Sequence, residues 1–202
     1  MDFVKEFSTF LHEKKIIRFG EFTLASGKQS SYYVDLRLVP SYPHQFRKMV
    51  KYLQNEIIQD VGLDQFDSIV SVPTGGLVIA SALAIETVKP LIYVRSKPKD
   101  YGTSKSVEGK IKEGMKVVMI DDVATTGGSV VNGIKSLKDE KIIVQDAYVI
   151  VNRMEGADEA LKKEGVTLHS ITNVMQITKS LHEQNLIADD VFQKVQKQID
   201  IK

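Results

Sequence analysis

Two adjacent acids and a glycine-rich loop lie together in the second half of the chain. Asp121 and Asp122 follow the apolar run 117–120, and after them comes the loop Val123, Ala124, Thr125, Thr126, Gly127, Gly128 and Ser129. The apolar run predicts a short buried strand, and the loop predicts a turn into a helix. Amides and hydroxyls at the start of a helix bind phosphate, and glycines let it approach closely. Carboxylates at the carboxyl end of a parallel strand suit sugar hydroxyls or a metal ion. The segment therefore predicts a ribose phosphate site.

A plain connecting loop is the alternative interpretation of this segment, because glycine-rich loops after strands are common. A nucleotide-hydrolase P-loop is excluded, since that motif needs Gly-Lys followed by Ser or Thr and this loop has no lysine. With both acids included, the segment 117–131 resembles the phosphoribosyl pyrophosphate (PRPP) motif of type I phosphoribosyltransferases. The resemblance implies that the acids hold the ribose hydroxyls and that the loop holds the 5′-phosphate.

The composition indicates one ordinary globular domain. The chain has 202 residues, of which 43% are hydrophobic and 26% are charged, and its formal net charge is +1. This balance argues against nucleic acid or an anionic membrane as the main partner. The absence of cysteine excludes disulfides, thiolate catalysis and cysteine zinc sites. Charges at Asp2, Lys5 and Glu6 interrupt any signal-peptide core, so we expect a cytoplasmic protein.

Apolar strands and helical segments alternate over most of the chain. An amphipathic helix is expected from Phe3 to Leu11, short strands at 19–24 and 32–36, and a longer helix after Pro43. Buried strands are then expected at 69–72, 91–94, 117–120, 147–151 and 166–171, and a last helix at 189–199. The uncharged stretch 68–85 is broken by Pro73 and two glycines, so it predicts strand, loop and helix, not a membrane span.

This alternation predicts an α/β fold with a twisted, mainly parallel sheet flanked by helices. We expect a single domain over 1–202, with a core at about 66–172 and a small N-terminal hood at about 1–40. The resemblance implies that this is the type I phosphoribosyltransferase fold.

A second glycine loop follows the strand expected at 69–72. Its sequence is Pro73-Thr74-Gly75-Gly76, which offers another set of backbone amides for an anion, although a tight turn explains the glycines equally well. In the family that this chain resembles, Thr74 and Gly75 would belong to the pyrophosphate loop.

Positive charge is concentrated between residues 95 and 116, where seven basic residues face three acidic ones. Such a run is typical of a solvated loop, and a mobile basic loop can also close over an anionic substrate. Residues 95–102 resemble the catalytic loop of orotate phosphoribosyltransferases, which reaches into the active site of the partner subunit. The resemblance implies PRPP contacts from Arg95, Ser96, Lys99 and Tyr101, with Arg95 and Lys99 on the pyrophosphate. Ser96 and Tyr101 depart from the family, where many members have lysine and histidine.

The residues expected to bind the base lie in two segments. Residues 22–28 and 32–35 resemble the N-terminal pattern of the orotate enzymes. Tyr32 and Tyr33 could offer a flat face to a pyrimidine, although half-buried strand tyrosines are ordinarily core residues. Lys28 could replace a functional lysine that one branch of the family has where this chain has Ala25.

The turn at 152–156 resembles the arginine-containing turn of the same family. Arg153 could pair bidentately with the carboxylate that distinguishes orotate from uracil, or it could simply be exposed to solvent. The resemblance also implies that Thr125 is a second orotate contact.

The resemblance covers nearly the whole chain and implies an orotate phosphoribosyltransferase. It would transfer ribose 5-phosphate from PRPP to orotate N1, with Arg95, Lys99, Asp121 and Asp122 as catalytic residues. Mg²⁺ would be held mainly through PRPP, with Asp121 and Asp122 as its possible protein ligands, and the protein would be a homodimer with shared active sites. The alternatives are a phosphoribosyltransferase for another base and a PRPP-sensing regulator without catalysis.

Overall fold

A six-stranded sheet forms the centre of the computed structural model, which describes residues 3–23, 27–95 and 106–200. The strand order is β5-β4-β3-β6-β7-β8, and all neighbours are parallel except β5, which is antiparallel to β4. The strands are β3 (Ser68–Ser71), β4 (Leu91–Val94), β5 (Val107–Glu108), β6 (Lys116–Ala124), β7 (Ile143–Asn152) and β8 (Thr167–Asn173). The predicted α/β fold with a mainly parallel sheet is therefore confirmed.

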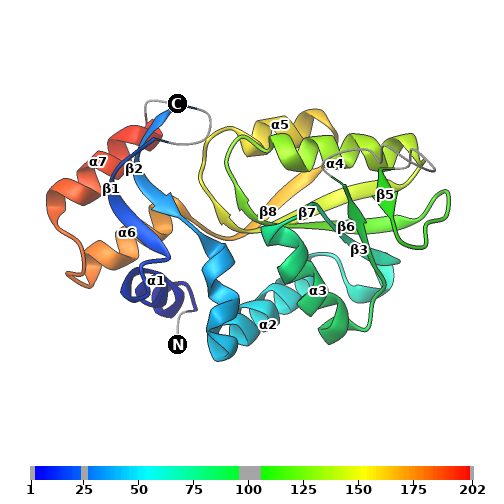
Figure 1. Ribbon diagram of the computed structural model, residues 1–202, viewed down its shortest axis with the longest axis horizontal. Helices are drawn as coiled ribbons and strands as arrows, with labels where there is room; N and C mark the ends of the chain where they lie inside the picture. Colours follow the sequence, from blue (N-terminus) through cyan, green and yellow to red (C-terminus); the bar gives the residue numbers. More distant parts are fainter. Residues whose placement is uncertain (1–2, 24–26, 96–105, 201–202) are drawn as a thin grey trace.

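Helices cover both faces of this sheet (Figure 1). On one side lie α2 (Pro43–Asp60) and α3 (Gly75–Thr87), and on the other α4 (Gly128–Asp139) and α5 (Ala157–Lys163). Side chains alternate across β6, so that Val118 and Ile120 join one apolar cluster while Val117 and Met119 join the other. The sheet thus separates two cores, as expected for strands buried on both faces.

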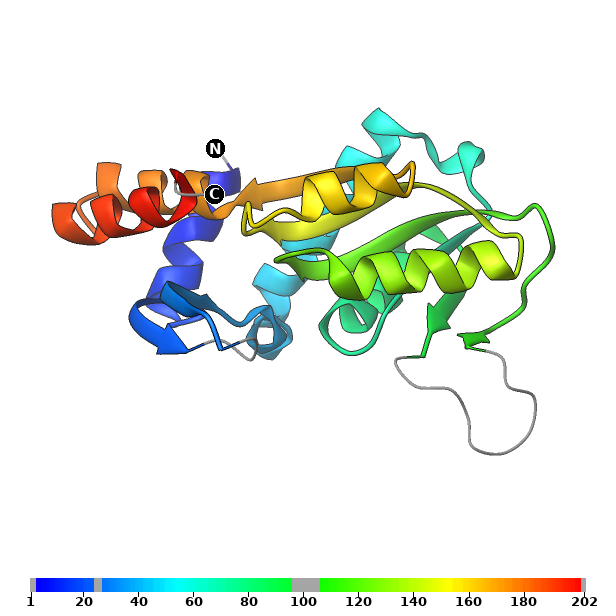
Figure 2. The same cartoon turned by 90° about the horizontal axis from the view of Figure 1, so that it is seen from above.

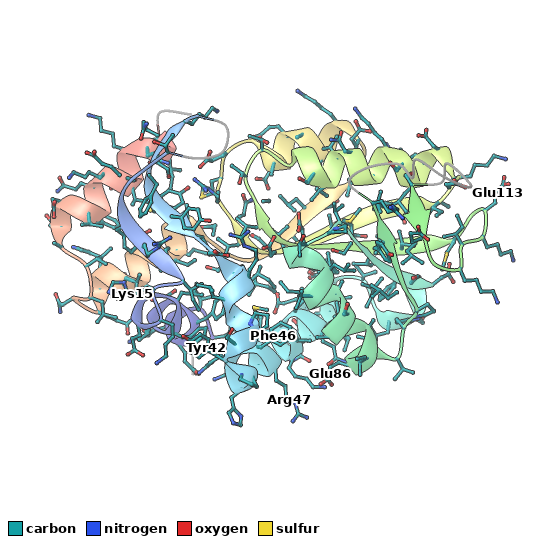
Figure 3. The ribbon with its side chains drawn as sticks, viewed as in Figure 1. Lys15, Tyr42, Phe46, Arg47, Glu86 and Glu113 are labelled. Carbon is teal, nitrogen blue, oxygen red and sulfur yellow. The ribbon has the colours of Figure 1, made fainter. Side chains whose placement is uncertain are left out.

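Ion pairs tie α2 to α3 at the outer side of their layer. Arg47 and Glu86 lie close together in Figure 3, with 3.9 Å between Nε and Oε1. Lys51 Nζ lies 2.5 Å from the other carboxylate oxygen of Glu86. These partly exposed pairs add to the buried apolar contacts by which α2 packs against α3, the helix that follows the second glycine loop.

The hood is built from both ends of the chain. The amino-terminal part is α1 (Phe3–Glu13), β1 (Ile17–Thr23) and β2 (Gln29–Val34), and the carboxyl-terminal part is α6 (Val174–Glu183) and α7 (Asp189–Asp200). In Figure 2 these elements form one lobe beside the sheet, with both termini in it. Apolar side chains from α1, α6 and α7 share a cluster with the sheet. Nothing in the sequence pattern assigned α6 and α7 to this lobe.

Short helical turns connect the lobes and layers. The 3₁₀ turn η1 (Leu36–Ser41) joins β2 to α2, and η2 (Leu63–Gln65) precedes β3. The expected strand 32–36 therefore ends at Val34, because Asp35 caps η1 by accepting a hydrogen bond from the Arg37 amide.

The stretch 68–85 forms β3 and most of α3, as the sequence predicts. Within the described ranges, no helix combines the length and apolar character needed to cross a membrane.

Candidate active site

The carboxyl ends of the parallel strands point toward the hood. β8 runs directly into α6 of the hood lobe, which fixes this direction for all the parallel strands (Figure 1). Ligands of open α/β sheets bind at this edge. The acid pair, both glycine loops and the Arg153 turn all lie here, at the ends of β3, β6 and β7.

The two acids lie within the last part of β6, and β6 continues beyond them to Ala124. β3 already ends at Ser71, opposite Ile120, so beyond this point β6 pairs only with β7. Beyond Ser71, the turn that leads from β3 into α3 takes the place beside β6 and packs against the carboxylates. Asp121 Oδ1 accepts a hydrogen bond from the Asp122 amide, and Asp122 Oδ1 accepts one from the Val123 amide, both at 2.9 Å.

The carboxyl group of Asp121 has a shifted pKa. Burial, and then the charge of the neighbouring Asp122 carboxylate, raise the pKa of Asp121 from 3.8 to about 8. A carboxyl group that stays partly protonated near neutral pH is typical of a functional site. Binding of a cation or of ribose hydroxyls that favour the ionised form would reverse this shift.

The second glycine loop packs directly against the acids. A Cβ added at Gly75 would lie 2.0 Å from Asp122 Oδ2, and one added at Gly76 would lie 2.5 Å from Asp121 Oδ1 and 2.7 Å from Asp121 Cα. Thr74 is the N-cap residue of α3, and its peptide bond with Pro73 is cis. The glycines are therefore required by the close approach of this turn to β6.

The first glycine loop lines a hollow of about 200 Å³ at the start of α4. Its walls are Asp121, Val123, Ala124, Thr125, Thr126, Gly127, Gly128, Ser129 and Val130. Gly127 has φ +76°, and a Cβ there would lie 2.8 Å from Leu161 Cδ1 of α5, so packing as well as backbone geometry requires it. A Cβ at Gly128 would meet nothing closer than 3.8 Å, so Gly128, unlike Gly127, leaves space open at the helix start.

Arg153 follows β7 and is buried, with only 5% of its surface exposed. Its amide donates to Ala124 O at 2.9 Å, which ties the arginine turn to the first glycine loop. Its Nε and Nη2 both donate to Glu155 Oε1, at 3.1 and 2.9 Å, and Nη2 also donates to Ser30 Oγ at 3.2 Å. The alternative of a solvent-exposed arginine is wrong. The Nε and Nη2 edge is occupied by Glu155, so Nη1 is the nitrogen these contacts leave for a ligand.

The two tyrosines of β2 point to opposite sides. Tyr32 is fully buried, with the Arg153 guanidinium 4.7 Å from its ring centre, so it presents no face to a base in this structure. The expected stacking role of Tyr32 is corrected to packing against Arg153. Tyr33 is half-buried, with Arg18 5.1 Å from its ring centre, and its hydroxyl accepts a hydrogen bond from Arg37 Nη2 at 3.3 Å.

Lys28 and Arg95 lie at the borders of the site. Lys28 is exposed and lines an open hollow of about 770 Å³ together with Asn152, Glu155 and Gly156 of the arginine turn. Arg95 directly follows β4, and its Nη1 lies 3.1 Å from Oε1 of Glu108 in the neighbouring antiparallel strand β5. Ser96, Lys99, Tyr101 and Ala25 lie outside the described residues.

Three residues of this region were not among the candidate site residues of the sequence. Ser30 and Glu155 contact the Arg153 guanidinium, as given above. Arg37 pairs with Asp35 at 2.6 Å, and this pairing raises the pKa of Arg37, with a further contribution from the charge of Asp122. Arg37 of η1 thus adds a positive charge that acts on Asp122 of the acid pair. Only the position of Glu155, two residues after an arginine at a strand end, could have indicated its role.

The acid pair is suited to a Mg²⁺ ion that arrives with a phosphorylated substrate. Mg²⁺ takes one or two protein carboxylates and completes its octahedron with phosphate and water oxygens. Over the described ranges, no three His, Cys, Asp or Glu side chains gather as a metal site. Asp121 and Asp122 beside an anion loop fit such a shared ion.

Comparisons with known proteins agree with this geometry. The family model described as a phosphoribosyl transferase domain matches residues 43–182. An orotate phosphoribosyltransferase of Cenarchaeum symbiosum (strain A) is 50% identical over 196 residues, which is 97% of this chain and 98% of that protein. The crystal structure of an orotate phosphoribosyltransferase from Aeropyrum pernix has a TM-score of 0.78 and 34% identity, covering 90% of this chain and 99% of that one.

A larger protein contains the same unit. The structure of Leishmania donovani UMP synthase matches with a TM-score of 0.85 and 31% identity, covering 98% of this chain but 42% of that one. The chain belongs to the phosphoribosyltransferase family, and within that family to the orotate phosphoribosyltransferases.

Proposed function

We propose that this protein transfers the ribose 5-phosphate group of PRPP to orotate, a step of pyrimidine nucleotide synthesis. A bond forms between orotate N1, which loses its proton, and C1 of the ribose. The bond from C1 to the pyrophosphate oxygen breaks, and its electron pair leaves with pyrophosphate. The products are orotidine 5′-monophosphate, pyrophosphate and the released proton.

One observation carries this proposal beyond the family name. The amide of Arg153 is hydrogen-bonded to Ala124 of the first glycine loop, so the turn with the buried arginine lies next to the loop that we assign to the 5′-phosphate. A guanidinium in such a place suits a base that carries a carboxylate. Uracil, adenine and hypoxanthine have no carboxylate, which favours orotate over these alternatives.

Each part of the substrate has a proposed partner. The Thr125 to Ser129 amides at the start of α4 bind the 5′-phosphate, and Asp121 and Asp122 bind the ribose hydroxyls and orient C1. Arg95 and Lys99 contact the pyrophosphate, together with Ser96, Tyr101 and the Thr74-Gly75 loop, and stabilise the negative charge that develops on it. Arg153, Thr125, Lys28 and Tyr33 surround the base. When bound, Mg²⁺ supplies further neutralisation of the pyrophosphate.

We place the reaction in the cytoplasm, in a homodimer. The reaction uses soluble phosphorylated substrates, and the absence of cysteine suits a reducing compartment. α3 and its C-cap residue carry exposed apolar side chains, with Val78 42%, Ile85 79% and Val88 89% exposed, and a second copy of the chain would cover them.

The test is a panel of bases. The purified protein is mixed with PRPP, Mg²⁺ and orotate while the loss of orotate absorbance is followed, and uracil, adenine and hypoxanthine are run alongside. We expect turnover of orotate alone. Turnover of a different base would overturn the base assignment, and PRPP binding without any turnover would favour the regulator.

Lys99 provides a sharper kinetic prediction. If it stabilises the leaving pyrophosphate, Lys99→Ala lowers kcat by about 100-fold or more, while the affinity for orotate changes little. Steady-state kinetics with both substrates varied measures the two effects separately. An unchanged kcat would exclude this role.

A further inference from the structure

An almost fully buried ion pair lies where the core meets the hood. The side chains of Arg153 and Glu155 are 6% and 3% exposed, and 2.9 Å separates Nη2 from Oε1. A buried ion pair gains little stability over apolar residues of similar volume, since both charges must leave water. Its presence beside the substrate site therefore calls for another explanation, and its geometry provides one.

The contacts of Glu155 fix both the plane and the direction of the guanidinium. Glu155 Oε1 accepts from Nε and Nη2 of Arg153 and also from the Tyr32 hydroxyl at 3.2 Å. The Tyr32 ring lies 4.7 Å from the guanidinium carbon, and Ser30 Oγ accepts from Nη2. These contacts account for Nε and Nη2, so the guanidinium can turn neither about its axis nor out of its plane without losing hydrogen bonds.

The partners of Arg153 come from both lobes. Glu155 belongs to the same core turn as Arg153, whereas Ser30 and Tyr32 belong to β2 of the hood. Ser30 is itself held from α7, because Gln198 Nε2 donates to its Oγ at 3.3 Å. The orientation of Arg153 therefore depends on how the hood lies against the core.

We propose that Glu155 is the positioning residue of the base site, and that it holds Arg153 so that Nη1 faces the carboxylate of the pyrimidine. Ser30 and Tyr32 complete this support from the hood. The inference rests on the proposed function, because it assigns Arg153 to the orotate carboxylate. It assigns Glu155 a role in specificity without contact to the substrate.

Removing Glu155 has opposite expected effects on orotate binding, depending on whether Glu155 acts only through its charge or by positioning Arg153. If only net charge mattered, losing this carboxylate would make the site more positive, and orotate would bind more tightly. If Glu155 orients Arg153, orotate binds more weakly because the guanidinium is released. The sign of the change in KM for orotate therefore separates the two explanations.

Two variants of Glu155 separate its charge from its hydrogen bonds. Glu155→Gln and Glu155→Ala lose the same charge, but only the glutamine keeps an acceptor oxygen for Arg153. We expect KM for orotate to rise about threefold in Glu155→Gln and about 30-fold in Glu155→Ala, because charged hydrogen bonds are the stronger ones. We expect kcat and KM for PRPP to stay within about twofold.

The matched control is Glu159→Ala, which removes the same charge from an exposed position four residues further on. Competitive inhibition by uracil, which has the ring but no carboxylate, serves as a second control in every variant. If Glu155 positions Arg153, inhibition by uracil stays unchanged. If the base site becomes generally looser, uracil and orotate both bind more weakly.

The inference is overturned if Glu155→Ala leaves KM for orotate unchanged or lowers it. It is also overturned if inhibition by uracil becomes weaker to the same extent as orotate binding. If neither Glu155 variant folds, Tyr32→Phe decides, since it removes one donor to Glu155 and keeps the ring. We then expect KM for orotate to rise about threefold while kcat stays unchanged. An unchanged KM for orotate in Tyr32→Phe would overturn the inference. A wild-type protein that does not use orotate would instead overturn the proposed function, and this inference with it.

Discussion

At the scale of single residues, the site combines a carboxyl group that resists ionisation with an arginine that cannot move freely. The pKa of Asp121 is raised to about 8 by burial and by Asp122. Arg153 is buried and held by Glu155 and Ser30. Both residues are arranged before substrate arrives, which reduces the ordering that binding requires.

The raised pKa of Asp121 has a consequence for stability. The folded state binds more protons than the unfolded state between pH 4 and pH 8, so the contribution of Asp121 to stability is fully present at low pH and is lost as the pH rises through 8. Asp121→Asn cannot ionise. We therefore expect its free energy of unfolding, relative to wild type, to increase by about 1–3 kcal/mol between pH 5 and pH 9.

Denaturant unfolding of both proteins at several pH values measures this difference. Asp139→Asn, at the end of α4, is the control for the loss of one carboxylate. Parallel pH profiles for wild type and Asp121→Asn would contradict the raised pKa.

At the scale of elements, the site depends on one turn meeting one strand. The β3–α3 turn approaches β6 so closely that a Cβ at Gly76 would lie 2.7 Å from Asp121 Cα. A backbone atom cannot turn away as a side chain can. The space between two elements, and not the turn alone, therefore determines the residue at this position.

Gly76→Ala is accordingly expected to destabilise the protein by about 1–3 kcal/mol, since the turn and β6 must move apart. Activity falls as well, because the same shift displaces the acid pair. Gly128→Ala is the matched control, with 3.8 Å to its nearest neighbour, and it should leave the free energy of unfolding within about 0.5 kcal/mol of wild type. Equal denaturation midpoints for Gly76→Ala and wild type would show that the turn can adapt.

At the scale of the whole molecule, the candidate site lies between the core and a hood made from both chain ends. Ser30 and Tyr32 reach Arg153 from the hood, and Arg37 brings a positive charge near Asp122. A second copy of the chain would add further residues if the homodimer shares its sites as we propose. The exposed apolar side of α3 is our candidate for that contact.

Ile85→Glu on α3 should therefore weaken the dimer, raising its dissociation constant at least about tenfold, because a charge replaces an apolar contact. Sedimentation over a range of protein concentrations measures this change. Ile58→Glu is the matched control, since Ile58 is 43% exposed on α2. An unchanged dissociation constant for Ile85→Glu would exclude α3 from the interface.

Shared active sites can be tested with two inactive variants. If the catalytic loop acts in the partner's site, mixed Lys99→Ala and Asp122→Asn subunits regain about a quarter of wild-type activity. Random exchange makes about half of the dimers hybrid, and each hybrid has one intact site. Sites that are complete within one subunit would regain nothing.

The sequence by itself determined the fold class and the place of the first glycine loop. Apolar runs such as 117–120, separated by helical segments, are local patterns whose burial follows from their period. Glycines and hydroxyl residues after a strand likewise favour a turn through their own and the adjacent backbone, which is a local effect. For this reason β3, β4 and the start of α4 lie where the patterns predicted them. β6 begins there too, but it continues to Ala124, through the two acids and the first two residues expected in the loop.

Only the tertiary structure decided the surroundings of Arg153 and Tyr32. The sequence left Arg153 as either a ligand contact or a solvent-exposed residue, and it left Tyr32 as either a stacking face or a core residue. These alternatives depend on how β2, which lies more than 100 residues earlier in the chain, packs against the turn after β7. Burial and ion pairing at such a contact are properties of the packed lobes, and no local pattern encodes them.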